Sequence, residues 1–597
     1  MASVMTRYSN LWLGMLCLAL TALPGQAQTR YRVSFPEATQ NRIQVEARYP
    51  TGGEDQVELF LPVWTPGVYA VLNYSQRVDQ LRATGENGQP LCLQPLSQSR
   101  WRVECEGQSE ITLFYRLKGG DRPSISGNYV DAGKAVLQGA ATYISPVTPV
   151  QSTFEVTVEL PAAWESIHTG LPPAADGERG HYLAKDIDQL IDCPIVAGST
   201  VEHEFRVAGV PHSLVYLGQT CAPWDHARAV RDVQAIVGAH HRMWGVFPFA
   251  QEPPGRYWFL SVRGVAGGLE HKNSTCLAWH LGEQFDRESE YLQWLGLIAH
   301  EYFHTWNGKN LRPITLGPFD YEARTDTPSL WIVEGLTTYY SSLILVRSNL
   351  LTPDGYLKTL SHQISRVKDK RWVSLTEASM RDWDPGSKLT SFYSGGAVVG
   401  FLLDQKIRQA TDGRASLDDL MRQAYQRYSE ERGYTEEQFE ALASQVAGID
   451  LNDFFRSYVH GTEPLDFSSA LRYYGLKFQP DPNLSARHHL GIATVTPSER
   501  LVLDWLVRGS PAERAGLEKG DELLAVDGVP VESESELNSL LRRCGPDGTV
   551  ELLVGRQGQS TRFRLAVGGT LQIDPQASPE SRAHWNEYLR GQTESAG

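Results

Sequence analysis

Two histidines and a glutamate stand together in a stretch that is otherwise mostly aliphatic and aromatic, within GLIAHEYFHTWNGKNLRP at residues 296–313. On an α-helix, positions four apart lie on one face, so His300 and His304 would direct their imidazoles toward a common point, with Glu301 beside it. Imidazole nitrogens bind zinc, and a catalytic zinc site adds a third protein ligand and keeps one position open for water. The adjacent glutamate can take a proton from that water, which is the chemistry of an HExxH motif.

The motif alone would also fit a helix whose histidines pair with other buried polar groups. Its surroundings favour a metal. Between Tyr291 and Trp306, apolar residues recur at helical spacing and leave only the face of the three ionisable groups polar. Such groups are costly to bury without partners, so they need a cation or a full set of hydrogen bonds.

A third ligand would be a His, Asp or Glu on a nearby helix. The segment SLWIVEGLTTYYSSLILV, residues 329–346, has an apolar, helical pattern in which Glu334 is the only charged residue. With the two histidines it would complete a His-His-Glu set that binds one zinc ion per chain. The alternative is a carboxylate near a helix start that interacts with the helix dipole.

Three motifs resemble the glycyl aminopeptidases, a family of zinc metallopeptidases with a thermolysin-like (gluzincin) catalytic domain: HEYFHTWNGKNLRP, LWIVEGLTTYY and GGLEHKNST. The resemblance implies that His300, His304 and Glu334 bind zinc and that Glu301 is the general base. His304 and Glu334 are 30 positions apart, a longer gap than in larger related aminopeptidase families. The additional residues around LGPFDYEARTDTPS could form a loop that shapes the substrate cleft.

The motif GGLEH, residues 267–271, bears on substrate selection. Gly267 and Gly268 would let a strand edge approach a bound peptide, because glycine has no side chain to obstruct backbone pairing. Glu270 then lies where it could bind a free α-ammonium group, which would exclude internal peptide bonds. The segment is similar to the exopeptidase signature of related zinc aminopeptidases, although His271 stands where they often carry an amide. The alternative role for Glu270 is a salt bridge at a strand end.

Peptide hydrolysis also needs a hydrogen-bond donor for the tetrahedral oxyanion. Tyr393 precedes two glycines in SFYSGGAVVGFLLDQKI, which is similar to the Tyr-x-x-Gly element of related aminopeptidases. The resemblance assigns its phenol to the oxyanion, and ordinary packing is the alternative in a chain with 25 tyrosines. Lys309 and Arg312 follow the zinc helix and are expected to bind its C-terminal carbonyl groups, with substrate contact as the alternative.

The chain has 597 residues, too many for one core, and a net charge of −15, which excludes the basic surface expected of a nucleic-acid-binding protein. Residues 1–27 are typical of a secretory signal peptide, with Arg7 before an apolar run and a small-x-small cleavage site before Gln28. We therefore expect secretion across the inner membrane into the periplasm, and no membrane span in the mature chain. A retained N-terminal anchor is the alternative.

The remaining sequence divides into four regions, which predict a multidomain α+β protein. Residues 28–207 alternate apolar and polar residues between turn signals, as in an antiparallel β-sandwich, and contain no cluster of catalytic residues. Residues 208–480 are mainly helical and would form the thermolysin-like catalytic domain. Residues 486–570 resemble a PDZ domain through LVRGSPAERAGLEKGDELLAVDGVPVESESELNSLL, and residues 571–597 would be a C-terminal tail.

The predicted PDZ domain could bind a peptide C-terminus by adding a strand and holding the carboxylate in the loop HHLGIA. A purely structural PDZ domain that packs on the catalytic domain is the alternative. Six cysteines follow the signal peptide, and among them Cys92 and Cys105 fall in successive strand-like runs that a disulfide could bridge.

The leading hypothesis is an exported zinc aminopeptidase that acts on peptides with a free N-terminus. The family resemblance indicates a preference for small N-terminal residues, glycine or alanine. One alternative is a zinc endopeptidase to which the PDZ domain delivers chain termini. Another is a catalytically inactive peptide-binding or chaperone-like protein with a vestigial metal site.

Overall fold

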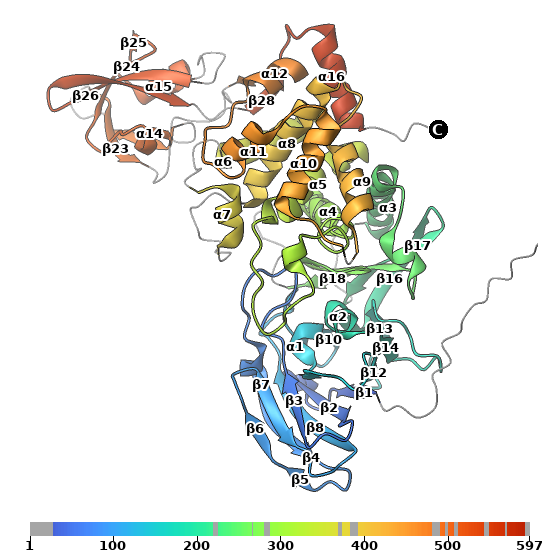
Figure 1. The fold of residues 1–597 in the computed structure, drawn as a ribbon. Helices are drawn as coiled ribbons and strands as arrows, with labels where there is room; N and C mark the ends of the chain where they lie inside the picture. Colours follow the sequence, from blue (N-terminus) through green and yellow to red (C-terminus); the bar gives the residue numbers. More distant parts are fainter. Residues whose placement is uncertain are drawn as a thin grey trace, which may run out of the picture.

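The structure is a computed structural model (Figure 1). It describes residues 28–591 except for 219–224, 265–266, 280–286, 368–372, 382–391, 431, 480–489, 496–499, 507–510, 542–548 and 567–569. The predicted signal peptide, residues 1–27, lies outside the described residues. A strand-rich N-terminal region, a central helical region and a small C-terminal β domain follow one another, which confirms the multidomain α+β class.

The N-terminal domain encloses one core between β-sheets, because alternate residues of its strands point inward. The order of its largest sheet is β14-β12-β1-β2-β8-β4-β5. Every adjacent pair in this sheet is antiparallel except β1 and β12, so the predicted purely antiparallel pattern is wrong at this pair. The strands are β1 (Thr29–Ser34), β2 (Arg42–Pro50), β4 (Val78–Thr84), β5 (Pro90–Leu91), β8 (Glu110–Lys118), β12 (Phe154–Glu159) and β14 (His181–Ala184).

Two four-stranded sheets complete this domain. One has the order β11-β3-β7-β6, with β3 (Gln56–Phe60), β6 (Leu93–Pro95), β7 (Arg100–Glu104) and β11 (Ser145–Pro146). The other has the order β13-β15-β10-β9, with β9 (Tyr129–Val130), β10 (Lys134–Leu137), β13 (Ser166–Thr169) and β15 (Ile195–Gly198). Cys92 and Cys105 are both free thiols, one exposed and one buried, so the possible disulfide between them does not form.

A five-stranded sheet begins the catalytic domain, in the order β16-β17-β18-β20-β19. Its strands are β16 (Thr200–Val207), β17 (Val210–Leu217), β18 (Tyr257–Arg263), β19 (Gly267–Glu270) and β20 (Ser274–Trp279). Because β16 forms a hairpin with β17, residues 200–207 belong to this sheet and not to the N-terminal domain that the sequence pattern assigned them to. The GGLEH motif forms the edge strand β19 and the position after it.

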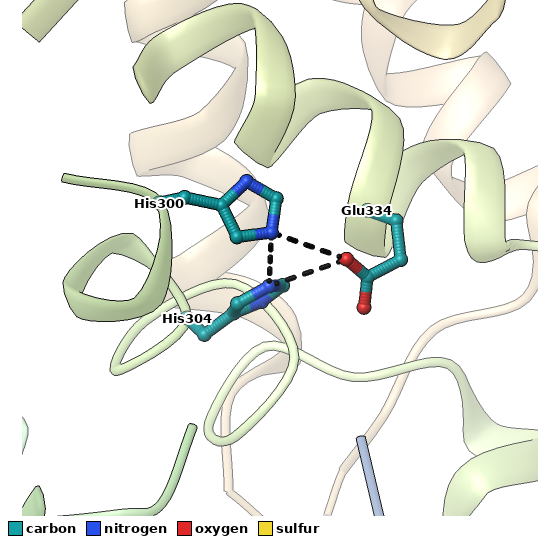
Figure 2. Close-up of side chains that lie close together, drawn as sticks. All are labelled: His300, His304 and Glu334. Carbon is teal, nitrogen blue, oxygen red and sulfur yellow. Dashed lines mark hydrogen bonds and ion pairs between the residues drawn. The ribbon is translucent and has the colours of Figure 1, made fainter. Parts of the chain in front are cut away.

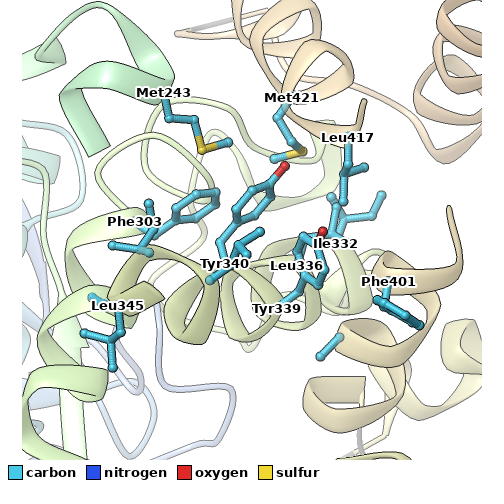
Figure 3. Close-up of a cluster of buried hydrophobic side chains, with 14 of the residues drawn as sticks. Met243, Phe303, Ile332, Leu336, Tyr339, Tyr340, Leu345, Phe401, Leu417 and Met421 are labelled. Atoms are coloured by element: carbon cyan, nitrogen blue, oxygen red, sulfur yellow. The ribbon is translucent and has the colours of Figure 1, made fainter. Parts of the chain in front are cut away.

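Helices pack around a shared apolar core behind this sheet. Figure 3 shows part of it, with side chains from α4 (Arg287–Phe303), α5 (Thr337–Arg347) and neighbouring helices. The ring of Phe303 stacks on that of Tyr340 with centroids 4.7 Å apart, which fixes the end of α4 against α5. Further helices are α3 (His226–Trp244), α6 (Pro353–Val367), α7 (Leu375–Met380), α8 (Phe392–Ala410), α9 (Leu417–Tyr428), α10 (Glu436–Ala447), α11 (Asn452–Tyr458) and α12 (Ser468–Tyr474).

The C-terminal β domain has its own core and the sheet order β22-β23-β24-β26-β27. Its main elements are β22 (Ile492–Val495), β23 (Val502–Leu506), β24 (Glu522–Val526), α15 (Glu534–Leu541), β26 (Thr549–Arg556) and β27 (Gln559–Ala566). Strand β22 lies at the edge of the sheet, where it has no second neighbour among the described strands. A free strand edge of this kind is what a PDZ domain offers to a peptide.

The last part of the chain returns to the catalytic domain (Figure 1). Strand β28 (Thr570–Ile573) pairs with β21 (Leu476–Gln479), and α16 (Pro579–Arg590) packs against α5 and α12. Trp585 and Tyr588 of α16 are buried in the catalytic core. Residues 571–590 are therefore part of the catalytic domain and not a tail, because the apolar face of α16 completes that core. Among the described helices, none has the length and apolar character that crossing a membrane requires.

Candidate metal centre and its surroundings

The two histidines of the HExxH motif converge at the end of α4 (Figure 2). Nε2 of His300 and Nε2 of His304 lie 3.2 Å apart. Nδ1 of His304 donates a hydrogen bond to the backbone carbonyl of Asn307 at 2.8 Å, so whenever the ring is neutral its Nε2 carries the lone pair, on the side of His300. This arrangement prepares one imidazole to bind a cation.

Glu334 reaches the same point from a π-helical turn, η5 (Trp331–Leu336). Its Oε2 lies 3.4 Å from Nε2 of each histidine, and the residue is only 2% exposed. A π-turn inside a helix is rare and often lies at a functional site. The side-chain amide of Asn307 braces this turn by donating to the carbonyls of Ile332 at 2.9 Å and Val333 at 3.1 Å.

Close glycine contacts hold η5 against α8. A Cβ atom at Gly335 would lie 2.5 Å from Cα of Gly396, and a Cβ atom at Gly396 would lie 2.4 Å from the carbonyl oxygen of Trp331. Side chains at either position would force the two helices apart. The second of the paired glycines after Tyr393 therefore brings α8 close to the turn that carries Glu334.

The charges of the three residues indicate that this point needs a positive charge. Burial favours the neutral imidazole of His304, but the carboxylates of Glu334, Glu270 and Glu301 and a hydrogen bond to Glu334 raise its pKa to about 10. Burial alone would raise the pKa of Glu334, yet the charge of His304 and hydrogen bonds to both histidines hold it well below its usual value. A divalent cation would supply this charge, and the three ligand atoms lie within 4.8 Å of one another. Two imidazoles and a carboxylate suit zinc.

Glu301 lies beside this triad and is 4% exposed. Burial, together with the negative charge of Glu270, raises its pKa well above that of an ordinary glutamate. Carboxylate oxygens of Glu270 and Glu301 and a ring nitrogen of His304 lie within 4.8 Å of one another. A Cβ atom at Gly268 would lie 2.2 Å from Oε1 of Glu301, so this glycine makes room for the Glu301 carboxylate.

Glu270 is 6% exposed at the end of β19, and we find no hydrogen bond to its carboxylate from the residues that the structure describes. No ion pair joins Glu270 to another residue in the part of the chain that the structure describes, so the strand-end salt bridge of the alternative interpretation is absent there. A turn of the N-terminal domain lies against it, because a Cβ atom at Gly67 would be 2.6 Å from both of its carboxylate oxygens. Gly267 has a φ of +153°, a backbone conformation that other residues rarely adopt.

Tyr393, at the start of α8, lies on the His300 side of the triad, with ring centroids 6.2 Å apart. Burial and the carboxylates of Glu334, Glu270 and Glu301 raise the pKa of its phenol well above the usual value. A hydrogen bond also links Tyr393 to Glu334. Its phenol is therefore protonated near neutral pH and can donate a hydrogen bond within this site.

Among the described residues, the side chain of Lys309 contacts a carboxylate and not the expected carbonyl groups at the end of α4. Its Nζ lies 2.8 Å from Oδ1 of Asp192, at the end of α2 (Ile187–Asp192) in the N-terminal domain. The same carboxylate lies 3.3 Å from Nδ1 of His271 and accepts a 2.7 Å hydrogen bond from the backbone of Lys272. Asp192 thus joins the segment after α4 to the GGLEH strand. The Arg312 guanidinium lies 5.9 Å from the ring centroid of Phe319.

Tyr69 is a site residue that the sequence did not indicate. Its phenol donates a 2.7 Å hydrogen bond to Oε1 of Glu334, although the two residues are 265 positions apart. The sequence VWTPGVY signals a turn through Pro66 and Gly67, but no local signal connects that turn to a glutamate in another domain.

Comparisons with known proteins agree with this geometry. Residues 30–199 match the model of the Peptidase M61 N-terminal domain, and residues 293–399 match the model of the M61 glycyl aminopeptidase. The chain therefore matches the models of both M61 domains and is a metallo-aminopeptidase. Residues 502–556 match a PDZ domain. The M61 family implies a catalytic metal, and His300 and His304 fall inside the matched region, as does Glu334.

A solved structure resembles most of this chain. It is an aminopeptidase N family protein from Idiomarina loihiensis, 25% identical, with a TM-score of 0.74 over 94% of this chain and 100% of that one. An M1 zinc metallopeptidase from Deinococcus radiodurans is 16% identical, with a TM-score of 0.46 over 74% of this chain and 97% of that one. A probable periplasmic serine endoprotease of the DegP-like type from Halomonas elongata is 42% identical over 72 residues. That match spans 12% of this chain and only 15% of the relative's length.

Proposed function

We propose that this chain is an exported zinc aminopeptidase that releases small N-terminal residues, glycine or alanine, from peptides with a free N-terminus. One observation carries the exopeptidase assignment: the buried Glu270 carboxylate lies within 4.8 Å of both Glu301 and His304 without a described hydrogen-bond partner of its own. A buried carboxylate without a partner is unfavourable, and a peptide α-ammonium group would neutralise it. The binding of that group next to the metal ligands would place the first peptide bond at the reacting centre.

His300, His304 and Glu334 would hold the zinc ion through Nε2, Nε2 and Oε2. Bound there, zinc would polarise the peptide carbonyl and lower the pKa of a water molecule. The raised pKa of Glu301 suits a group that first accepts a proton from water and then donates it to the leaving amine. Tyr393 would donate its phenolic hydrogen to the oxyanion, which develops only as the carbonyl carbon becomes tetrahedral.

The preference for glycine or alanine is supported by the surroundings of Glu270. Gly67 and its turn lie against the two carboxylate oxygens, and a single added Cβ atom at Gly67 would already be too close, at 2.6 Å from both oxygens and from Cδ1 of Leu269. An amino acid bound through its α-ammonium group would have its own Cβ next to this crowded region. Small side chains are the ones that such a site accepts most readily.

Export to the periplasm is supported by the signal-peptide pattern of residues 1–27. The edge position of β22 among the described strands supports peptide binding by the PDZ domain. Cell fractionation and N-terminal sequencing of the mature protein test the export proposal. A mature protein that begins near Gln28 in the periplasmic fraction is expected, whereas retention of residues 1–27 on a cytoplasmic protein would contradict it.

Paired peptides test the exopeptidase assignment. The same peptide is supplied with a free N-terminus and with an acetylated N-terminus, and products are identified by mass spectrometry. We expect release of the first residue from the free form only. Cleavage of the acetylated peptide at an internal bond would support an endopeptidase instead, and peptide binding without turnover after zinc loading would support the inactive binding protein.

A further inference from the structure

The two carboxylate oxygens of Glu334 have different partners. Oε2 faces the two histidine nitrogens at 3.4 Å, on the side where a metal would bind (Figure 2). Oε1 accepts the 2.7 Å hydrogen bond from the phenol of Tyr69. A carboxylate held in this way offers one oxygen to a cation, while the other is occupied by the protein.

Tyr69 is held firmly in place. It follows a turn, Thr65 to Val68, closed by a 3.0 Å backbone hydrogen bond, and the φ of +94° at Gly67 suits the third position of a type II turn after Pro66. The Tyr69 ring is 9% exposed and packs edge-on against Phe392, with centroids 6.3 Å apart. A phenol with a fixed ring and a buried hydroxyl keeps its hydrogen-bond direction.

The loop between His304 and Glu334 anchors the chain that leads into this turn. The backbone N–H of Val63 donates to the carbonyl of Tyr321 at 2.9 Å, and Nε1 of Trp64 donates to the carbonyl of Asp320 at 2.7 Å. Tyr321 is buried in the core of the N-terminal domain, where its hydroxyl donates to Asp188. The additional residues of the long gap therefore dock on the N-terminal domain and hold the Tyr69 turn over the site.

We propose that Tyr69 is a positioning residue that fixes Glu334 as a single-oxygen metal ligand, so that the N-terminal domain completes the metal centre of the catalytic domain. This inference rests on the proposed metal site. It gives the N-terminal domain a part in holding a metal ligand, through the Tyr69 hydroxyl. Removal of the hydroxyl would take away the 2.7 Å hydrogen bond to Oε1 and leave the carboxylate less restrained, although Tyr393 also bonds to Glu334, so the ligand set would be weakened and altered.

The test is a Tyr69→Phe variant of the full chain, which keeps the ring and its contact with Phe392. Zinc affinity is measured by competition with a chromogenic chelator, and the visible spectrum is recorded after cobalt(II) loading. We expect zinc affinity to fall by about 10- to 100-fold, with a changed cobalt spectrum, as for other partners of metal ligands. The kcat should fall, with little change in KM.

A matched control is Tyr74→Phe, because Tyr74 lies in the same domain and donates its hydroxyl to the carbonyl of Ser126 at 2.8 Å. The Tyr74→Phe variant should leave zinc affinity and the cobalt spectrum unchanged.

A second variant covers the case in which Tyr69→Phe does not fold. Trp64→Phe removes an anchor of the turn and should also weaken zinc binding. Wild-type affinity and spectrum in a folded Tyr69→Phe protein would overturn the inference alone. Failure of the wild-type chain to bind metal would overturn the proposed function as well.

Discussion

Gly268 and Glu301 are in direct contact across two elements: a Cβ atom at Gly268 would lie 2.2 Å from Oε1 and 2.3 Å from Cδ of Glu301. The edge strand β19 thus packs its glycine against the carboxylate of the predicted general base. The sequence pattern predicts that Gly267 and Gly268 let a bound peptide approach, because a strand without side chains can pair with another backbone. The structure adds a different reason for the second glycine, which is to leave space for a catalytic side chain.

A Gly268→Ala substitution should therefore impair catalysis by displacing Glu301. We expect a fall of roughly 10²-fold in kcat/KM, the loss typical of a displacement of about 1 Å at a reacting group. Gly296→Ala is the control, because a Cβ atom there, on α4, would meet only Cδ1 of Leu345 at 3.9 Å. That change should leave kcat/KM unaltered, and equal rates for both variants would contradict the role of Gly268.

Replacement of Glu301 by Gln should remove turnover without removing the metal. Glutamine keeps the shape of the side chain but cannot accept the proton from water, and general-base catalysis contributes about 10²- to 10⁴-fold. Metal content by elemental analysis and the rate of amide hydrolysis are measured on the same preparation. A variant with full metal content and wild-type kcat would exclude Glu301 as the base.

The Glu270→Gln variant should have two measurable effects. Loss of the charge that binds the α-ammonium group should lower kcat/KM on free peptides by roughly 10²- to 10³-fold. The negative charge of Glu270 also raises the pKa of Glu301, so its removal should lower that pKa. Because Glu301 must be deprotonated to act as a base, the acid limb of the kcat/KM profile should move to lower pH. An unmoved acid limb would argue against coupling between the two carboxylates.

Stability at acidic pH should depend on His212. The ring is fully buried, its Nδ1 donates to the carbonyl of Val210 at 3.1 Å, and its Nε2 accepts from the hydroxyl of Tyr302 at 2.8 Å. Burial lowers its pKa from 6.5 to about 4. Between pH 4 and pH 6.5 the unfolded chain binds a proton at this histidine that the folded chain does not. The free energy of unfolding therefore keeps its full value above pH 6.5 and falls as the pH drops toward 4, by at most about 3 kcal/mol for this residue.

Denaturant unfolding at several pH values measures this effect in the wild type and in a His212→Gln variant. The variant should have lower stability at pH 7 but a shallower decline between pH 6.5 and pH 4. The metal is kept constant in all samples, since its release would add a separate pH dependence. Parallel declines in the two proteins would contradict the assignment of the proton to His212.

Local patterns predicted much of this molecule. The i, i+4 spacing of His300 and His304 and the lone charge of Glu334 in an apolar segment pointed to residues that the structure brings together. Contacts between distant segments could not be predicted in the same way. Tyr69, Asp192 and the apolar face of α16 act through tertiary packing, and their own neighbours in sequence give no indication of where they dock. The domain boundaries differ from the predicted ones for the same reason. The strands β16 and β28 belong to the domain of the strands with which they pair, and the sequence does not show those partners.

The central claim is metal-dependent release of a small N-terminal residue with Glu301 as the base. The most direct measurement is the release of glycine and alanine from chromogenic N-terminal amides by purified mature protein, before and after chelation and zinc addition, beside Glu301→Gln. We predict release that chelator abolishes, that zinc restores, and that is lost in the variant and on N-acetylated substrates. Release that survives metal removal, or no release from free amines by the zinc-loaded wild type, would contradict it.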